Sequence, residues 1–340
     1  MLMAIEETLS SAFDLSFEQT VPRSLVHKHS LENVFLTELK SCGDDWFICG
    51  ARLPTMHRFF NEAVRSPGAD ILFYTELGRQ ASIAVSHAFF GVAHDQVFIF
   101  EQSDANLMEA LRKSIGPVNS ASIVVEIKVK EKETRRNGAV TRIVAEHAMY
   151  NGRKQVLHGT GGWSLQPKAL FQRFRRMSTH GAVAVNGRHG CELGMSPKRL
   201  GRELAENVVI SAPVSLGDGS ESAASLIVDL DHPFFFDHPC DHVPGMLLLE
   251  GCAQCTTIVA AEAAGKDPGE VFLYAYDTQF TQFVECHLPV TLTAHVSPMR
   301  QDNDGVSHTT VKIHISQQDV VSGTATMSVA FLGQRASGRS

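Results

Sequence analysis

The sequence predicts an α+β protein made of two similar halves, each a curved antiparallel sheet wrapped around a long central helix. The first observation is an internal repeat, in which a histidine and two phenylalanines precede an apolar helix that carries a glutamate. The repeat runs from His57 to Glu76 and again from His232 to Glu250, so the spacing within the two copies agrees to one position. Because internal repeats reveal repeated architecture, two structurally alike halves follow from this pattern.

A glycine–threonine pair near the end of each half is the second observation. Gly159 and Thr160 recur as Gly323 and Thr324, which follow the second helix at a shorter distance in the chain than the first pair follows the first helix. The order of the motifs is unchanged, so the shorter separation indicates loops of different length within one repeated fold.

Each half contains a helix that carries the repeated glutamate, predicted at residues 70–90 and 244–264. Gly91 and Gly265 follow these segments, and glycine favours the left-handed conformation that ends a helix. The second segment is apolar on nearly every side, which is typical of a helix that is buried all round.

Strands are predicted after each helix, where β-branched residues recur in alternation. The predicted strands are 121–129, 140–145, 290–296, 309–315 and 324–330. A buried helix wrapped by a curved antiparallel sheet is the hotdog arrangement, so the predicted fold is a tandem (double) hotdog.

The repeat also predicts the domain organisation. We expect an N-terminal hotdog repeat at 20–166, a linker at 167–195 and a C-terminal hotdog repeat at 196–333. The linker begins at a Gln-Pro pair and contains an Asn-Gly pair, both typical of loops. Such a chain is a pseudo-dimer of two repeats, and a homodimer of the whole chain is left open.

Composition and charge narrow the class of protein. The chain has 340 residues, of which 44% are hydrophobic and 20% charged, and its formal net charge is −7. These values fit a soluble globular protein and argue against a nucleic-acid-binding protein, which usually has a basic face. The basic run of Arg173, Arg175 and Arg176 reads as solvated linker charges, with a site for an acidic carrier protein as the alternative.

The expected location is the cytoplasm. The N-terminal residues lack the basic and apolar segments of a signal peptide. No stretch approaches the roughly 18 apolar residues of a transmembrane helix, so no membrane span is predicted. The seven cysteines are odd in number and scattered, which fits reduced thiols.

The start of the second helix offers backbone donors to a carbonyl oxygen. Pro244 suits the beginning of a helix, and Gly245 lets a thioester approach the free N–H groups, which would stabilise an oxyanion. Glu250 lies further along this apolar helix. A carboxylate there is either a satisfied structural acid or a catalytic one.

Glu76 repeats this arrangement and is a second candidate catalytic acid. Arg79, three residues later, either pairs with Glu76 or anchors an anionic group such as phosphate. Among the histidines, His238 is the preferred general base, and His232 either acts in catalysis or braces the turn. His242 is expected to be structural.

No metal or nucleotide cofactor is predicted. Cys252 and Cys255 form a Cys-x-x-Cys pair, but both lie within the predicted helix and no second ligand pair accompanies them. Cys240 is kept only as an alternative nucleophile. The sequence also lacks the glycine-rich motifs that bind nucleotide phosphates.

Two families share these motifs. The segment from Pro233 to Gln254 resembles the active-site segment of the 3-hydroxyacyl-carrier-protein dehydratases, which implies catalytic roles for His238 and Glu250. Over nearly its whole length the chain resembles the A-factor biosynthesis family, tandem hotdog proteins that make γ-butyrolactone signals. The motifs that carry this resemblance are Val26-His27-Lys28, Leu53-Pro54, His57 to Phe60, Glu76 to Gln80, Leu200-Gly201-Arg202 and Asp237 to Met246.

The second resemblance implies a reaction, the transfer of a β-ketoacyl group from an acyl carrier protein or CoA thioester to the hydroxyl of dihydroxyacetone phosphate. The phosphopantetheine arm would arrive with the carrier protein. By this resemblance His57, Arg202 and Gln254 join Arg79 and Gly245 as expected substrate-binding residues.

Two alternatives remain open. The family's second repeat carries Glu-x-x-Arg-Gln, whereas this chain has Ala253 in place of the arginine. That departure favours a dehydratase or thioesterase that acts on acyl thioesters as the first alternative. A non-catalytic module that binds a lipid or a carrier protein is the second.

Overall fold

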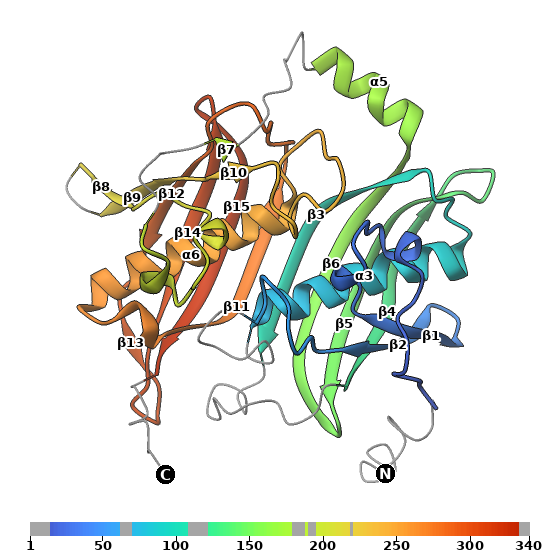
Figure 1. Ribbon diagram of the computed structural model, residues 1–340, viewed down its shortest axis with the longest axis horizontal. Coiled ribbons are helices and arrows are strands. Elements are labelled where there is room, and N and C mark those ends of the chain that lie inside the picture. Colours follow the sequence, from blue (N-terminus) through green and yellow to red (C-terminus); the bar gives the residue numbers. More distant parts are fainter. Residues whose placement is uncertain are drawn as a thin grey trace. The chain divides into compact units, whose positions relative to one another are not determined.

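The chain folds into two compact units, each built around one long helix (Figure 1). The computed structural model describes residues 14–61, 70–107, 122–178, 188–189, 195–217 and 220–332. Unit 1 comprises Met1–Asn61, Arg65–Asn186 and Asp231–Asp241, and unit 2 comprises Glu62–Val64, Gly187–Leu230 and His242–Ser340. The sequence places Asp231–Asp241 in the second repeat, whereas its contacts group it with unit 1.

Unit 1 is an antiparallel sheet with a central helix, as predicted. Its strands pair in the order β1-β2-β4-β5-β6-β3. Their bounds are β1 Leu36–Gly43, β2 Trp46–Arg52, β3 Gln96–Leu107, β4 Ser122–Thr134, β5 Val140–Asn151 and β6 Lys154–Pro167. Helix α3 (Ile71–Phe90) lies across these strands, and short 3-10 turns precede β1 at η1 (Arg23–Val26) and η2 (Leu31–Asn33).

The ends of α3 follow from local chemistry. The Asp70 carboxylate caps the N-terminus by accepting the N–H of Leu72 at 2.9 Å. Gly91, with φ of 64°, ends the helix in the left-handed conformation. The helix and its C-terminal glycine lie where the sequence predicted them, because a terminal glycine is a local signal.

Unit 2 repeats the design. Its strands pair in the order β11-β15-β14-β12-β9-β8, and β13 adds to β14. Their bounds are β8 Val214–Leu216, β9 Glu221–Ser225, β11 Val271–Phe280, β12 Thr291–Val296, β13 Arg300–Gln301, β14 Ser307–Gln317 and β15 Val320–Phe331. The remaining elements are the pair β7 (Arg188–His189) and β10 (Val228–Asp229), and the 3-10 turns η4 (Pro197–Leu200), η5 (Ala205–Asn207) and η6 (Pro268–Glu270).

Helix α6 (Gly245–Ala264) is the core helix of unit 2. It begins after Pro244 and ends at Gly265, whose φ is 62°. By length and composition alone α6 could span a membrane, but 78% of its apolar window is buried inside the fold. This burial is what a helix wrapped by a sheet requires, and Cys252 and Cys255 are buried thiols within it.

The predicted linker contains a helix, α5 (Lys168–Ser178), and residues 179–187 and 190–194 lie outside the described part of the chain. Arg173 is exposed, in accord with a solvated charge. Arg175 is not: its side chain is buried and pairs with Asp241, Nε to Oδ2 at 3.1 Å and Nη2 to the backbone oxygen at 2.9 Å. The interpretation of the whole run as solvated is therefore wrong for Arg175, since a contact distant in sequence removes it from water.

Candidate active site

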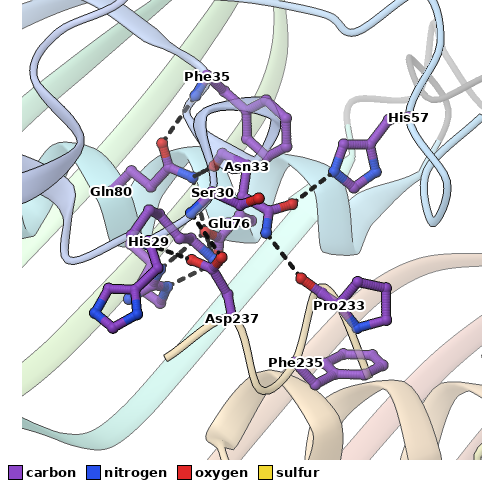
Figure 2. A network of polar contacts seen from close by, with 12 residues as sticks. His29, Ser30, Asn33, Phe35, His57, Glu76, Gln80, Pro233, Phe235 and Asp237 are labelled. Carbon is purple, nitrogen blue, oxygen red and sulfur yellow. Dashed lines mark hydrogen bonds and ion pairs between the residues drawn. The ribbon is translucent and has the colours of Figure 1, made fainter. Parts of the chain in front are cut away.

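A glutamine on α3 ties the helix to the chain that precedes β1. The Oε1 atom of Gln80 accepts the N–H of Phe35 at 3.0 Å. Its Nε2 donates to the backbone oxygen of Asn33 and to Oε1 of Glu76, both at 2.8 Å. Every polar atom of this buried amide is thereby used, so the residues around Glu76 are held rigidly (Figure 2).

Glu76 has no exposed surface and faces two cations. Arg79 donates to both carboxylate oxygens, from Nε at 2.7 Å and from Nη2 at 2.9 Å, and Nζ of Lys28 lies 3.1 Å from Oε1. Burial alone would raise the pKa of Glu76, but the charges of Arg79 and Lys28 outweigh it and hold that pKa well below its usual range. Glu76 is therefore ionised. This geometry favours the ion-pair interpretation, and a role for Glu76 in proton transfer stays a prediction.

The turn that carries His238 is bound to the loop before β1. The Asp237 carboxylate accepts the N–H groups of His29 at 2.8 Å and Ser30 at 2.9 Å. The side-chain amide of Asn33 donates to the carbonyl of Pro233 at 3.0 Å. Figure 2 shows these contacts next to Glu76, so the turn belongs to the surroundings of α3.

His238 is a neutral imidazole in a cationic setting. Burial, followed by the charges of Arg79 and Lys28, lowers its pKa to about 4. Its Nδ1 atom is buried and has no hydrogen-bond partner among the described residues. Because buried polar atoms are normally satisfied, this nitrogen is suited to a ligand hydroxyl. The sequence grouped His238 with Glu250, whereas the structure places it among the charges of unit 1.

Cys240, two residues after His238, is not poised as a nucleophile. Burial raises the pKa of its thiol to about 11, in spite of the nearby positive charges of Arg79 and Lys28. A thiol that stays protonated near neutral pH is a poor nucleophile. The structure therefore gives no support to Cys240 as the attacking group.

His57 and His232 make the same contacts in the two copies of the motif. Nδ1 of His57 accepts the N–H groups of Phe59 and Phe60, at 3.1 and 3.2 Å. Nδ1 of His232 likewise accepts the N–H groups of two phenylalanines, Phe234 and Phe235, each at 3.2 Å. Both imidazoles thus stabilise a turn. For His232 this favours the bracing interpretation, while the predicted catalytic role of His232 and substrate-binding role of His57 stay untested predictions.

Unit 2 holds the second glutamate in a matching framework. Oε1 of Gln254 accepts the N–H of Val209 at 3.0 Å, and its Nε2 donates to the oxygen of Asn207 at 2.7 Å and to Glu250 at 2.6 Å. Nη2 of Arg202 lies 2.6 Å from Oε1 of Glu250. Gln254 and Arg202, expected to bind substrate, are therefore engaged with Glu250.

Few backbone N–H groups at the start of α6 are available to bind an oxyanion. The N–H groups of Leu247 and Leu248 bind the Pro244 carbonyl at 2.9 and 3.2 Å. The predicted oxyanion site at Gly245 would therefore depend on the N–H groups of Gly245 and Met246, and it stays a prediction. His242 packs against the ring of Phe283 with centroids 4.9 Å apart.

Two residues of the Val26-His27-Lys28 motif receive a role in the site only from the structure. Lys28 is buried, pairs with Glu76 and lies 4.8 Å above the ring of Phe234. His27 lies with its Nε2 atom 2.8 Å from Nε2 of His87. Burial, followed by repulsion from His87 and Arg79, lowers the pKa of His27 to about 3. The sequence did contain a signal for Lys28. Lys28 and Arg202 are separated by the same number of residues as Glu76 and Glu250, so the two cations occupy matching positions in the repeat.

Comparison with known proteins agrees with the predicted family. The sequence model of the family described as "A-factor biosynthesis hotdog domain" matches residues 9–149 and 191–333. The chain is 30% identical over 287 residues to a Streptomyces virginiae protein named 2-oxo-3-(phosphooxy)propyl 3-oxoalkanoate synthase, covering 84% of this chain and 90% of the relative. A Streptomyces coelicolor protein of the same name is 30% identical over 295 residues, covering 85% and 88%.

Solved structures of hotdog proteins show a more distant likeness. A putative oleoyl thioesterase from Lactobacillus plantarum matches with a TM-score of 0.47 and 12% identity, over 86% of this chain and 99% of that one. A dehydratase-cyclase domain from ambruticin biosynthesis matches with a TM-score of 0.45 and 15% identity, over 88% and 95%.

Proposed function

This chain belongs to the A-factor biosynthesis hotdog family, and on that premise we propose that it is an acyltransferase. The donor is a β-ketoacyl group on an acyl carrier protein, and the acceptor is the hydroxyl of dihydroxyacetone phosphate. The name of the two Streptomyces relatives describes the ester that this reaction would form. The observation that carries the proposal is a neutral His238 whose buried Nδ1 atom has no partner among the described residues, next to the cations Arg79 and Lys28.

Arg79 and Lys28 supply the charge that a phosphorylated acceptor needs. Arg79 uses Nε and Nη2 on Glu76, which among the described residues leaves Nη1 for another acceptor, and its side chain is 26% exposed. Guanidinium groups match phosphate oxygens well in geometry. Glu76 then acts as the fixed anion that orients Arg79. Burial lowers the pKa of Lys28, and the charge of Glu76 opposes that change.

The proton path uses His238 alone. The acceptor hydroxyl gives its proton to His238 while its oxygen attacks the thioester carbonyl. The tetrahedral intermediate expels the thiolate of the phosphopantetheine arm, which takes the proton back from His238. The products are a phosphorylated ester and a free carrier thiol, so protons and electrons balance without a metal or nucleotide.

Binding of the phosphate also improves the base. Arg79 and Lys28 depress the pKa of His238 in the free protein. A phosphate dianion between these groups would offset their charge and move that pKa back toward its ordinary value near 6.5. His238 would therefore become a stronger base when the acceptor is present.

Mass spectrometry of a reaction between a β-ketoacyl carrier protein and dihydroxyacetone phosphate tests the proposal. We expect the phosphorylated ester with the native chain and a decrease of about 100-fold or more with His238→Asn, the usual contribution of a general base. His295→Asn, on an exposed face of β12, is the matched control and should leave the rate unchanged. Free thiol without acceptor, or an enoyl thioester from a 3-hydroxyacyl substrate, would instead identify a thioesterase or dehydratase.

Partners and location follow from the same proposal. The carrier protein and the small phosphorylated acceptor are the proposed partners, and the phosphopantetheine arm is the only prosthetic group involved. We place the reaction in the cytoplasm, where carrier-bound intermediates are made. The free thiols of the six described cysteines support this location, because reducing compartments keep cysteines unpaired.

A further inference from the structure

Each unit contains a copy of the same buried polar framework. Each of four positions in unit 1 has a counterpart in unit 2 at one constant separation in the chain, namely Lys28 and Arg202, Asn33 and Asn207, Glu76 and Glu250, and Gln80 and Gln254. The contacts correspond as well: the glutamine donates to the asparagine carbonyl at 2.8 Å in unit 1 and 2.7 Å in unit 2. In both units a cation meets the glutamate, at 3.1 and 2.6 Å. A framework retained in both copies serves the fold of both.

The side chains that could act in catalysis or bind a ligand differ between the two copies. At that same separation, unit 1 and unit 2 have His27 and Gly201, His29 and Glu203, Arg79 and Ala253, and His87 and Ala261. The stretch 61–70, which follows the first copy of the phenylalanine pair, contains no histidine to match His238. The imidazoles and the second cation therefore accompany Glu76 and have no counterpart at the matching positions around Glu250.

The number of cations that contact the glutamate also differs between the two units. Glu76 faces two cations, Lys28 and Arg79, and Asp237 is a second carboxylate near them. Arg79 binds Glu76 through Nε and Nη2, so its Nη1 is the group that this arrangement offers to an anionic ligand. Glu250 pairs with Arg202 and accepts a neutral hydrogen bond from Gln254, so within the described residues its charge is matched by one cation. A phosphate dianion would meet the Arg79 guanidinium in the first arrangement, whereas Ala253 stands at the matching position in the second.

We infer that the chain has a single catalytic site, in unit 1, and that the Glu250 framework of unit 2 has a structural role only. The ligand class of the unit 1 site is a phosphate monoester that carries a free hydroxyl. This inference rests on the proposed function for its chemistry. The non-equivalence of the two glutamates rests on the contacts themselves.

Matched variants of the full-length chain test the inference. Lys28→Met and Glu76→Gln should each lower kcat/KM by about 100-fold, because they release the groups that hold the acceptor. Arg202→Lys and Glu250→Gln should leave kcat/KM within about twofold while lowering Tm, as expected when a buried ion pair is altered. Because Glu250→Gln could prevent folding, Arg202→Lys, which keeps the charge, provides the second measurement. Equal losses of kcat/KM from the unit 1 and unit 2 variants would overturn the inference.

A binding measurement separates this inference from the proposed reaction. Dihydroxyacetone phosphate, or inorganic phosphate at higher concentration, should raise Tm of the native chain and of Arg202→Lys, and should not raise Tm of Lys28→Met. This pattern without any acyl transfer would refute the proposed reaction and retain the single site. Stabilisation that depends equally on Lys28 and Arg202 would show two equivalent anion sites and reject the inference.

Discussion

At the residue scale, the state of His238 is set by its neighbours. A buried imidazole next to two cations resists protonation, which explains a pKa of about 4. At neutral pH His238 is therefore almost wholly in the basic form that proton abstraction requires. Its reactivity should depend on the charge of Arg79 and Lys28.

This dependence gives the first prediction. Arg79→Met should raise the pKa of His238 from about 4 toward 6.5, because one of the two cations that oppose its protonation is removed. An NMR titration of the imidazole Cε1–H resonance, assigned with His238→Asn, measures the shift. Arg199→Met, which removes an exposed cation paired with Glu262 in unit 2, is the control. An unchanged pKa in Arg79→Met would show that Arg79 does not act on His238.

The second prediction concerns the bracing histidines. His57→Phe and His232→Phe should each lower the free energy of unfolding by about 1–3 kcal/mol, because two backbone N–H groups lose their acceptor in a buried turn. Asparagine at the same positions should restore part of the loss, since its side-chain oxygen can accept such N–H groups. Urea unfolding measures these differences. Phenylalanine variants as stable as the native chain would contradict the bracing role.

At the scale of the elements, the repeated glycines explain how neighbouring strands approach closely. Gly159 on β6 pairs with Ala105 on β3, and a Cβ atom at Gly159 would collide with the backbone oxygen of Asp104. Gly323 on β15 lies opposite Phe280 on β11, and a Cβ there would lie 2.9 Å from the Phe280 ring. The glycine–threonine pair seen in the sequence thus marks the same backbone contact in each sheet.

The third prediction is a graded loss of stability. Gly159→Ala should be the most destabilising, by about 1–3 kcal/mol, because backbone atoms must move to accommodate the new methyl group. Gly323→Ala should cost less, since the contacts there are longer. Gly162→Ala is the control, because its Cβ would meet the flexible side chain of Gln102. Chemical denaturation of the three variants tests the order, and a tolerant Gly159→Ala would refute the steric explanation.

The elements also show what the sequence could predict. Helices α3 and α6, their terminal glycines and strands such as β4 and β14 were predicted, because periodicity and caps are local properties. The strands β1 to β3, β6 to β11 and β13 and the 3-10 turns were not predicted. The residues of β1, β2 and β3 lack a clear alternation, and β2 and β3 pair with β4 and β6, which come much later in the chain.

The candidate site was predicted less completely for a physical reason. The sequence identified Glu76, Arg79 and His238, yet it joined His238 to Glu250, the glutamate that follows it in the same repeat. The structure joins the turn to unit 1 through Asp237, whose carboxylate oxygens accept backbone N–H groups of His29 and Ser30. Any residue type except proline supplies a backbone N–H, so this contact has no sequence signature.

At the scale of the whole molecule, burial of histidines links stability to pH. His27, His57, His147 and His238 are four such side chains in unit 1, and burial is the largest cause of the low pKa of each, about 3 for His27 and about 4 for the others. In the unfolded chain these groups would titrate near 6.5. Between pH 6.5 and about 4 the unfolded state therefore binds more protons than the folded state.

The fourth prediction follows from this greater proton binding by the unfolded chain. The free energy of unfolding should be nearly constant above pH 7 and should fall progressively from pH 6.5 to 4, because protonation then favours the unfolded chain. Urea unfolding at a series of pH values measures the slope. His147→Gln removes one of these four groups, at a buried position that bonds Ser82, so the stability of this variant should depend less steeply on pH. If the free energy of unfolding of the native chain stayed constant down to pH 5, these histidines would be protonated in the folded chain as well. That result would contradict a neutral His238.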